Sequence, residues 1–179
     1  MKHYFAYGSN MAVSRLEARV GPVEVLGAAR LVSHALRYHK LGRDGSGKCD
    51  AFHTGRDGDC LYGVVFALEV SQLEGLDRFE GRGYRRKEVS VEMLAAGCSS
   101  LAETYVALES AIAPRLKPYD WYHGFVVAGA EAQGLPLEYL EGLRRVETTV
   151  DADERRRAGN EAIAAGLDLR PSRSHETAR

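Results

Sequence analysis

Glu80 is the residue whose type and place in the sequence most favour catalysis. The residues before it predict a helix, because Leu73, Leu76 and Phe79 share one face and Gly81 can end the helix. Glu80 then stands at the negative end of the helix dipole, which disfavours a carboxylate and favours the protonated acid. Such a carboxyl group suits general acid–base catalysis near neutral pH. A solvated last-turn glutamate is the alternative that this local pattern leaves open.

The second pattern is Tyr7-Gly8-Ser9-Asn10, where a predicted strand ends in a glycine turn and runs into a helix. Backbone amides at such a junction can bind a carboxylate or a developing oxyanion. Asn10 is predicted to be the N-cap of the helix that follows. Ser9 is not expected to be a nucleophile, because neither a GxSxG nor an SxxK context surrounds it.

Other patterns favour structural roles. Gly42, Gly47 and Lys48 match the start of a phosphate-binding GxxxxGK loop, but Cys49 replaces the Ser or Thr that would bind Mg²⁺. The glycines around them predict a hairpin turn rather than a nucleotide site. The six histidines lack the spacing of a metal site, so no metal is expected. The arginines at 155–157 follow several acidic residues and predict a solvated helix face.

Strand patterns early in the chain and helix patterns later predict an α+β fold. Two helix starts show capping-box spacing, Ser71 with Glu74 and Asp151 with Glu154. One domain is expected over residues 1–166, followed by a polar, mobile tail over 167–179. Strands are expected over 3–7, 61–68, 84–93 and 101–107, with two more within 23–41 and turns around a short strand over 42–59. Helices are expected over 11–20, 71–80, 122–133, 136–146 and 151–166.

The composition argues against several classes of partner. The 24 Lys and Arg nearly balance the 25 Asp and Glu, so no global field attracts nucleic acid or an anionic membrane. No apolar run reaches the roughly 18 residues of a membrane span, and the start lacks a signal-peptide pattern. Three scattered cysteines without a CxxC pair indicate a reducing compartment, and the protein is expected to be cytoplasmic.

Several motifs, in this order and spacing, resemble the γ-glutamylcyclotransferase family. They are YFAYGSNM at 4–11, LDRFEG at 76–81 with Tyr84 after it, Tyr122, Gly129-Ala130 and GLPLEY at 134–139. The resemblance extends over roughly residues 3–165. The YGSN loop combined with the downstream Glu-Gly carries most of its specificity.

The resemblance implies a compact α+β fold around a mixed β-barrel with flanking helices, in which loop and glutamate meet in one pocket. It implies cleavage of a γ-glutamyl amide to 5-oxoproline and a free amine, with no cofactor and no enzyme nucleophile, because the substrate's α-amine attacks its own γ-carbonyl. A small γ-glutamyl substrate is the expected partner, and a homodimer is compatible with the family. The family's catalytic glutamate corresponds to Glu80, its substrate-binding loop to Tyr7, Gly8, Ser9 and Asn10, and a pocket-wall tyrosine to Tyr122.

The branch of the family stays open. Asn10 argues against the glutathione-specific branch, which typically carries YGSL, and the YGT with a nearby lysine of the γ-glutamyl-ε-lysine branch is absent. A general γ-glutamyl-dipeptide enzyme remains, as does a biosynthetic relative that removes a protecting γ-glutamyl group from an antibiotic precursor. A non-catalytic binding module is a further alternative, against which the presence of Glu80 argues.

Overall fold

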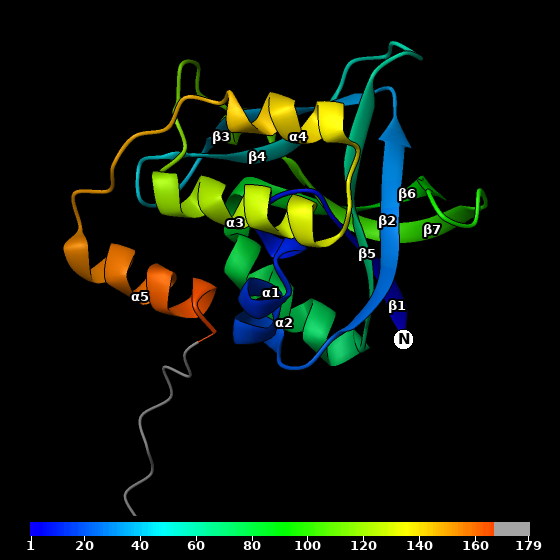
Figure 1. Cartoon of the computed structure of the whole chain (residues 1–179), viewed down its shortest axis with the longest axis horizontal. Coiled ribbons are helices and arrows are strands. Elements are labelled where there is room, and N and C mark those ends of the chain that lie inside the picture. The colour runs from blue at the N-terminus through cyan, green and yellow to red at the C-terminus, as the bar shows by residue number, and fades with distance from the viewer. Residues whose placement is uncertain (167–179) are drawn as a thin grey trace, which may run out of the picture.

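A closed barrel of five strands forms the centre of the fold (Figure 1). The structure is a computed structural model and describes residues 1–166. In pairing order the strands are β1 (Lys2–Ala6), β5 (Cys60–Leu68), β2 (Glu24–Val32), β6 (Tyr84–Met93) and β7 (Ser99–Ala107). All pairs are antiparallel except β1 with β7, whose parallel contact closes the barrel. The predicted α+β fold with a mixed barrel is confirmed.

Strand β5 is buried along most of its length, as its apolar run predicts. Residues 64–68 are all buried, and four of them, Val64, Val65, Phe66 and Leu68, have no exposed surface. Because consecutive strand residues point to opposite faces, both faces of β5 are covered. Strand β1 pairs with β5 and ends at Ala6, so the loop that begins at Tyr7 emerges at one end of the barrel.

Strands β3 (His34–Leu41) and β4 (Gly47–His53) form a separate two-stranded sheet. The residues between them make a turn that contains Asp44, whose Oδ2 accepts from Lys48 Nζ of β4 at 2.7 Å. The GxxxxGK stretch therefore lies in a hairpin, as the sequence predicts, and opens no helix.

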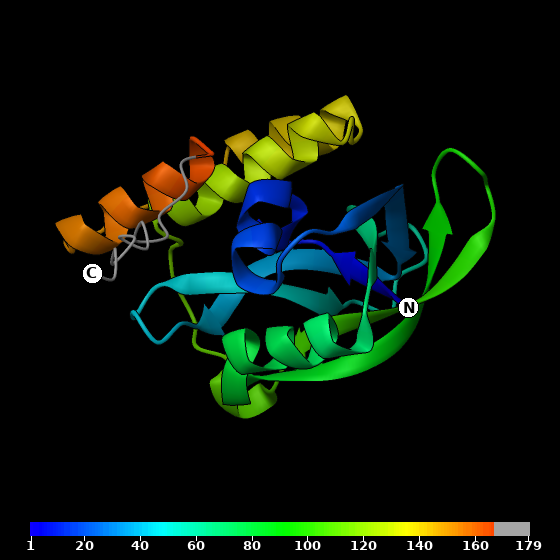
Figure 2. The ribbon, with the colours of Figure 1, turned by 90° about the horizontal axis from the view of Figure 1, so that it is seen from below.

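Helices cover two sides of the barrel (Figure 2). Helices α3, α4 and α5 gather on one side and α2 lies on the other, with α1 between them in contact with α2 and α5. No helix within residues 1–166 is both long and apolar enough to span a membrane. The helices are α1 (Val13–Val20), α2 (Val70–Glu80), α3 (Asp120–Ala132), α4 (Leu137–Arg144) and α5 (Glu154–Ala164), with short 3₁₀ turns η1 (Ser9–Met11), η2 (Gly81–Gly83) and η3 (Glu109–Ala111). The tail predicted over 167–179 lies outside the described residues.

Both predicted capping boxes are wrong by two residues. Helix α2 begins at Val70, and its capping box is formed by Glu69 and Gln72 instead of Ser71 and Glu74. A capping box requires only a side-chain acceptor and a reciprocal side chain three residues later, so overlapping pairs compete and spacing alone does not choose between them. At α5 the N-cap is Asp153, whose carboxylate accepts from the Arg156 amide, and not Asp151.

Two further expectations about the helices are wrong, one about an N-cap and one about a buried face. Asn10 caps no helix, because it lies inside η1 and the N-cap of α1 is Ala12. Phe79 does not join Leu73 and Leu76 in the core, and 54% of its surface is exposed. Two successive steps of three residues rotate the side-chain direction by about 120°, which carries Phe79 away from Leu73.

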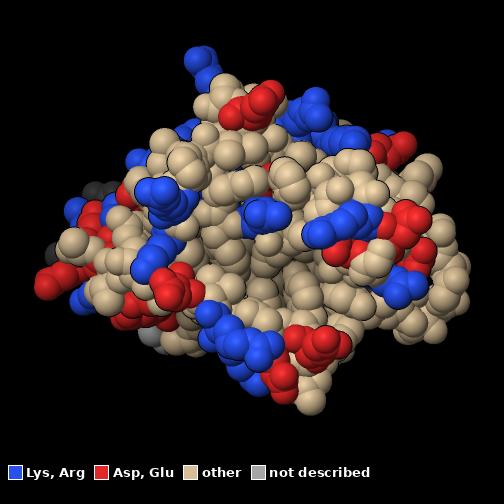
Figure 3. Space-filling model, turned by 90° about the horizontal axis from the view of Figure 1, so that it is seen from above, with Lys and Arg blue, Asp and Glu red and all other residues tan. Residues whose placement is uncertain are grey.

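Charged side chains of both signs are interspersed on the surface (Figure 3). On the face shown, most Asp and Glu side chains lie next to Lys or Arg. Positive and negative side chains are therefore close neighbours on this face, which agrees with the near-zero net charge of the chain.

Candidate active site

A pocket of about 410 Å³ opens at the end of the barrel where β1 gives way to η1. Its walls come from the 7–10 loop, the end of α2, the β3–β4 turn and the start of α3. Segments far apart in the sequence therefore meet at one cavity. All the residues predicted for the site line this pocket, namely Tyr7, Gly8, Ser9, Asn10, Glu80 and Tyr122.

Glu80 ends α2, and 15% of its side chain is exposed. Asn10 Nδ2 donates to Glu80 Oε1 at 3.1 Å, and Arg19 Nη1 donates to the same oxygen at 3.0 Å. Arg19 also donates to Asn10 Oδ1 at 2.9 Å, which completes a triangle of contacts. Within residues 1–166 nothing donates to Oε2, so this oxygen is available to a bound molecule.

Arg19 of α1 forms a direct ion pair with Glu80 at 3.0 Å, so the carboxylate at the end of α2 has a cationic partner. No local sequence pattern indicates that Arg19 reaches the end of α2, because this contact joins two helices that are far apart in the sequence.

Hydrogen bonds hold the side chains of the 7–10 loop in place. The Tyr7 hydroxyl donates to the backbone oxygen of Tyr105, and Asn10 Nδ2 donates to the Tyr4 hydroxyl at 2.9 Å. Ser9 Oγ accepts from Arg15 Nε at 3.3 Å. A guanidinium cannot take a proton from Ser9, which agrees with the expectation that Ser9 is not a nucleophile.

Burial keeps the hydroxyl and thiol groups of the pocket neutral. It raises the pKa of Tyr7, Tyr84 and Tyr122 well above the ordinary value of 10. It also raises the pKa of the Cys49 thiol to about 12. The Tyr122 hydroxyl accepts from the Cys49 amide at 3.1 Å and so joins α3 to β4. The Tyr7 and Tyr84 hydroxyls already donate to the backbone oxygens of Tyr105 and Cys49, so toward a ligand they can only accept. Cys49 is not a thiolate nucleophile at neutral pH.

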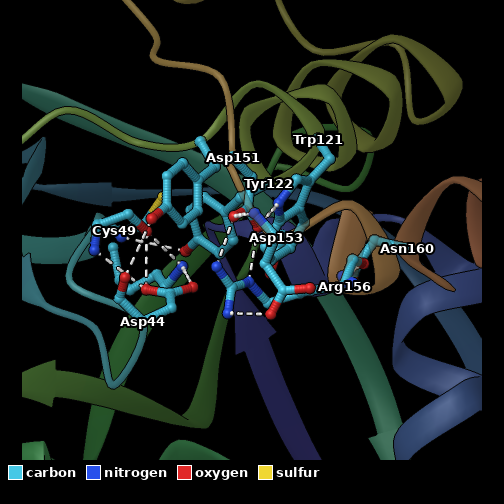
Figure 4. A network of polar contacts seen from close by, with 12 residues as sticks. Asp44, Cys49, Trp121, Tyr122, Asp151, Asp153, Arg156 and Asn160 are labelled. Carbon is cyan, nitrogen blue, oxygen red and sulfur yellow. Dashed lines mark hydrogen bonds and ion pairs between the residues drawn. The ribbon is translucent and has the colours of Figure 1, made fainter. Parts of the chain in front are cut away.

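A buried carboxylate outside the predicted site, Asp151, organises one wall of the pocket (Figure 4). It has no exposed surface and accepts from Trp121 Nε1 at 2.8 Å and from Arg156 Nε at 2.6 Å. Hydrogen bonding to Arg156 lowers the pKa of Asp151 well below its ordinary range. Arg156 lines the pocket and is not part of a wholly solvated helix face, so that expectation is wrong for this residue.

Cationic side chains on other elements also reach the pocket, and sequence reasoning missed them. Arg15 of α1 lies 5.4 Å from the Trp121 ring centroid and donates to Asn160 Oδ1 of α5 at 2.6 Å. Lys48 of β4 lies 4.5 Å from the Tyr122 ring centroid. No local signal marks these residues, because only the packing of α1, β4 and α5 brings them together. The pocket combines two carboxylates, neutral hydroxyls and six cations, which suits a small anionic ligand. Within residues 1–166 no group of three or more His, Cys, Asp and Glu side chains could hold a metal ion.

Comparison with known proteins places this architecture in a family. Residues 60–143 match the AIG2-like family. A human gamma-glutamylcyclotransferase is 31% identical over 153 residues, covering 80% of this chain and 78% of the relative, and the bovine protein of that name is 28% identical over 150 residues with the same coverage. A solved structure named gamma-glutamyl cyclotransferase has a TM-score of 0.80 at 26% identity, covering 92% of this chain and 99% of that chain. The identity to the human protein over 80% of this chain and the matching fold of the solved structure lead to the same conclusion. The chain belongs to the γ-glutamylcyclotransferase family of enzymes.

Proposed function

We propose that the protein converts a γ-glutamyl amide into 5-oxoproline and a free amine, with Glu80 as general base and then general acid. The observation that carries this proposal is the Glu80 carboxylate in the pocket. Its Oε1 is fixed by Asn10 and Arg19, and its Oε2 accepts no hydrogen bond from residues 1–166. A carboxylate with one oxygen held and the other facing a bound molecule is oriented for proton transfer.

In this reaction the substrate α-ammonium nitrogen loses two protons, and the leaving nitrogen gains one. Glu80 removes a proton from the substrate α-ammonium group, and the freed amine attacks the γ-carbonyl carbon to form the new C–N bond of the five-membered ring. When the tetrahedral intermediate collapses, the original amide C–N bond breaks and its electron pair stays on the leaving nitrogen. Glu80 returns the first proton to that nitrogen. The ring nitrogen loses its second proton to solvent, and the released amine takes up a proton from solvent to become an ammonium ion. Proton transfer of this kind contributes about 10²–10⁴-fold to the rate.

The other predicted residues supply binding. In this proposal the amides of Gly8, Ser9 and Asn10 stabilise the oxyanion or hold the substrate α-carboxylate, while Tyr7 and Tyr122 form the wall. A pocket that holds the substrate folded also brings its amine against its own carbonyl. The fixed positions of these side chains support this assignment, since Tyr7 and Tyr122 are each tied to a backbone group.

Release of 5-oxoproline tests the proposal. γ-Glutamyl-alanine, glutathione, γ-glutamyl-ε-lysine and a γ-glutamylated aminoglycoside side chain are incubated with the wild type, Glu80→Gln and Glu74→Gln. Glu74 is exposed on the same helix and serves as the matched control. The wild type and Glu74→Gln are expected to release 5-oxoproline from at least one substrate, and Glu80→Gln is expected to lose at least about 10²-fold in kcat.

Circular dichroism and thermal unfolding show whether Glu80→Gln is folded. Full activity in a folded Glu80→Gln protein would contradict the assignment of the acid and base. If the wild type binds the substrates and releases nothing, the pocket is a binding module.

A further inference from the structure

The pocket is strongly cationic, although the protein as a whole is not. Six cationic side chains line it against two carboxylates, whereas the whole chain carries a net charge of −1. Three of the six cations are neutralised, Arg19 by Glu80, Lys48 by Asp44 and Arg156 by Asp151. The remaining three therefore give the cavity its positive character.

Two of the remaining cations, Lys40 and Arg43, have no anion of their own. Within residues 1–166 neither forms an ion pair or a side-chain hydrogen bond. The third, Arg15, is occupied by hydrogen bonds to Ser9 and Asn160. Lys40 is 7% exposed, and its Nζ lies 4.6 Å from the Tyr84 ring centroid. Burial of an unpaired ammonium group is costly, so its position indicates a missing anionic partner.

Lys40 and Arg43 lie against the turn that directly follows Glu80. A Cβ placed on Gly83 would be 2.7 Å from Lys40 Cε, and a Cβ on Gly81 would be 2.5 Å from Arg43 Nη2. Both glycines belong to η2, so the two cations occupy the space that the missing side chains leave. The unpaired charges are thus next to the group that the proposed function assigns to proton transfer.

We propose that Lys40 and Arg43 form an anion subsite that binds a carboxylate of the leaving amine, and that these two residues select for such a leaving group over a neutral or polycationic one. The proposal rests on the function proposed above. After proton transfer the leaving nitrogen lies at Glu80. In an α-amino acid the carboxylate carbon is two bonds from that nitrogen, roughly 2.5 Å away. A carboxylate so close to the nitrogen reaches a cation site beside Glu80. A polycationic leaving group, such as an aminoglycoside side chain, would instead meet like charge.

The test compares leaving groups that differ only in charge. γ-Glutamyl-alanine carries the carboxylate, and γ-glutamyl-alaninamide replaces it by a neutral amide. kcat/KM for 5-oxoproline release is measured with both substrates for the wild type, Lys40→Met, Arg43→Met and Arg82→Met. The wild type is expected to prefer the carboxylate substrate by about 10- to 100-fold, the effect of one or two charge-assisted hydrogen bonds. Lys40→Met and Arg43→Met are expected to reduce that preference at least about 5-fold, by lowering kcat/KM for γ-glutamyl-alanine alone.

Arg82→Met is the matched control, because Arg82 is an exposed cation in the same turn and does not line the pocket. It is expected to keep the wild-type preference. Equal losses on both substrates would show that the pair holds the γ-glutamyl half or only stabilises the end of α2, and would overturn the proposal. Arg43 is exposed, so Arg43→Met tests the idea even if Lys40→Met does not fold.

A binding measurement separates this proposal from the proposed function. Affinities of both compounds are measured by calorimetry in the Glu80→Gln background, with and without Arg43→Met. Selective binding of the carboxylate compound that Arg43→Met abolishes supports the subsite, even if the wild type releases no 5-oxoproline. Equal affinities for the two compounds, or no binding of either, would overturn the subsite whatever the catalytic result.

Discussion

Gly129→Ala is expected to damage the active site from a position outside the pocket. Gly129 lies in α3, and its backbone packs against η1, which contains two residues of the 7–10 loop. A Cβ at this position would be 2.5 Å from both the Ala12 nitrogen and the Met11 carbonyl carbon. Ordinary contact begins at 3.4 Å, so α3 and η1 must separate by about 0.9 Å.

The size of the effect follows from this displacement. Both clashing atoms belong to the backbone, so no change of rotamer relieves the contact. Overpacking of this kind costs about 1–3 kcal/mol, whereas replacing a helical Gly by Ala returns at most about 1 kcal/mol. The net loss of up to about 2 kcal/mol lowers Tm by up to roughly 8 °C for a chain of this length. A misplacement near 1 Å at a catalytic group can cost about 10²-fold, so kcat/KM should fall more steeply than stability.

The assay is thermal unfolding together with 5-oxoproline release from γ-glutamyl-alanine. Gly124→Ala is the matched control, because Gly124 is an exposed residue of the same helix whose Cβ would meet nothing within 4 Å. It should leave activity unchanged and raise or preserve Tm. If Gly129→Ala behaves like Gly124→Ala in both measurements, the close approach of α3 to η1 does not position the loop.

Two further predictions concern the Asp151 wall and the cysteines. Asp151→Asn removes the buried carboxylate that pairs with Arg156 and is expected to lower Tm at pH 7 by roughly 3–8 °C. The loss is smaller than for a fully buried ion pair, because Arg156 is partly exposed and water screens its charge. Because Arg156 lowers the pKa of Asp151 below 3.8, the carboxylate stabilises the fold fully above about pH 4, and this contribution is lost as the pH falls further. The Tm values of wild type and Asp151→Asn should therefore converge in acid, and a constant difference down to pH 2 would contradict the pairing. Exposed Cys98 should react with a thiol reagent in the native protein at pH 8. Cys49 is buried and its pKa is raised to about 12, so it should react only after denaturation. Peptide mass spectrometry identifies the labelled cysteine, and rapid labelling of Cys49 in the native protein would show that the pocket wall opens.

The elements of the fold were largely determined by local sequence. Hydrophobic run length predicted β5, alternation predicted β6, and the glycines around residue 42 predicted the β3–β4 turn. These signals are short-range, because strand and turn preferences depend on neighbouring residues. The same is true of Glu80 at a helix end, since Gly81, with φ of 70°, adopts the conformation that favours glycine at a helix end.

Local sequence was less able to choose between neighbouring acceptors. Asp151 and Asp153 both lie close enough before α5 to serve as its N-cap. In the structure Asp153 is the N-cap, and Asp151 is buried. The choice depends on Trp121 and Arg156, whose hydrogen bonds give the buried carboxylate its partners. A buried charge must be paired, and its pairing is decided by packing.

The tertiary structure alone decided which charges share the pocket. Arg19 reaches Glu80 across 61 residues of sequence, and Arg15 reaches Asn160 across 145. No periodicity or motif records such contacts, because they arise when α1 is packed between α2 and α5. The sequence by itself thus determined the strands, the turn and a glutamate at a helix end. The partners that orient this glutamate, and the cations that surround it, exist as a site only after the barrel closes and the helices pack around its end.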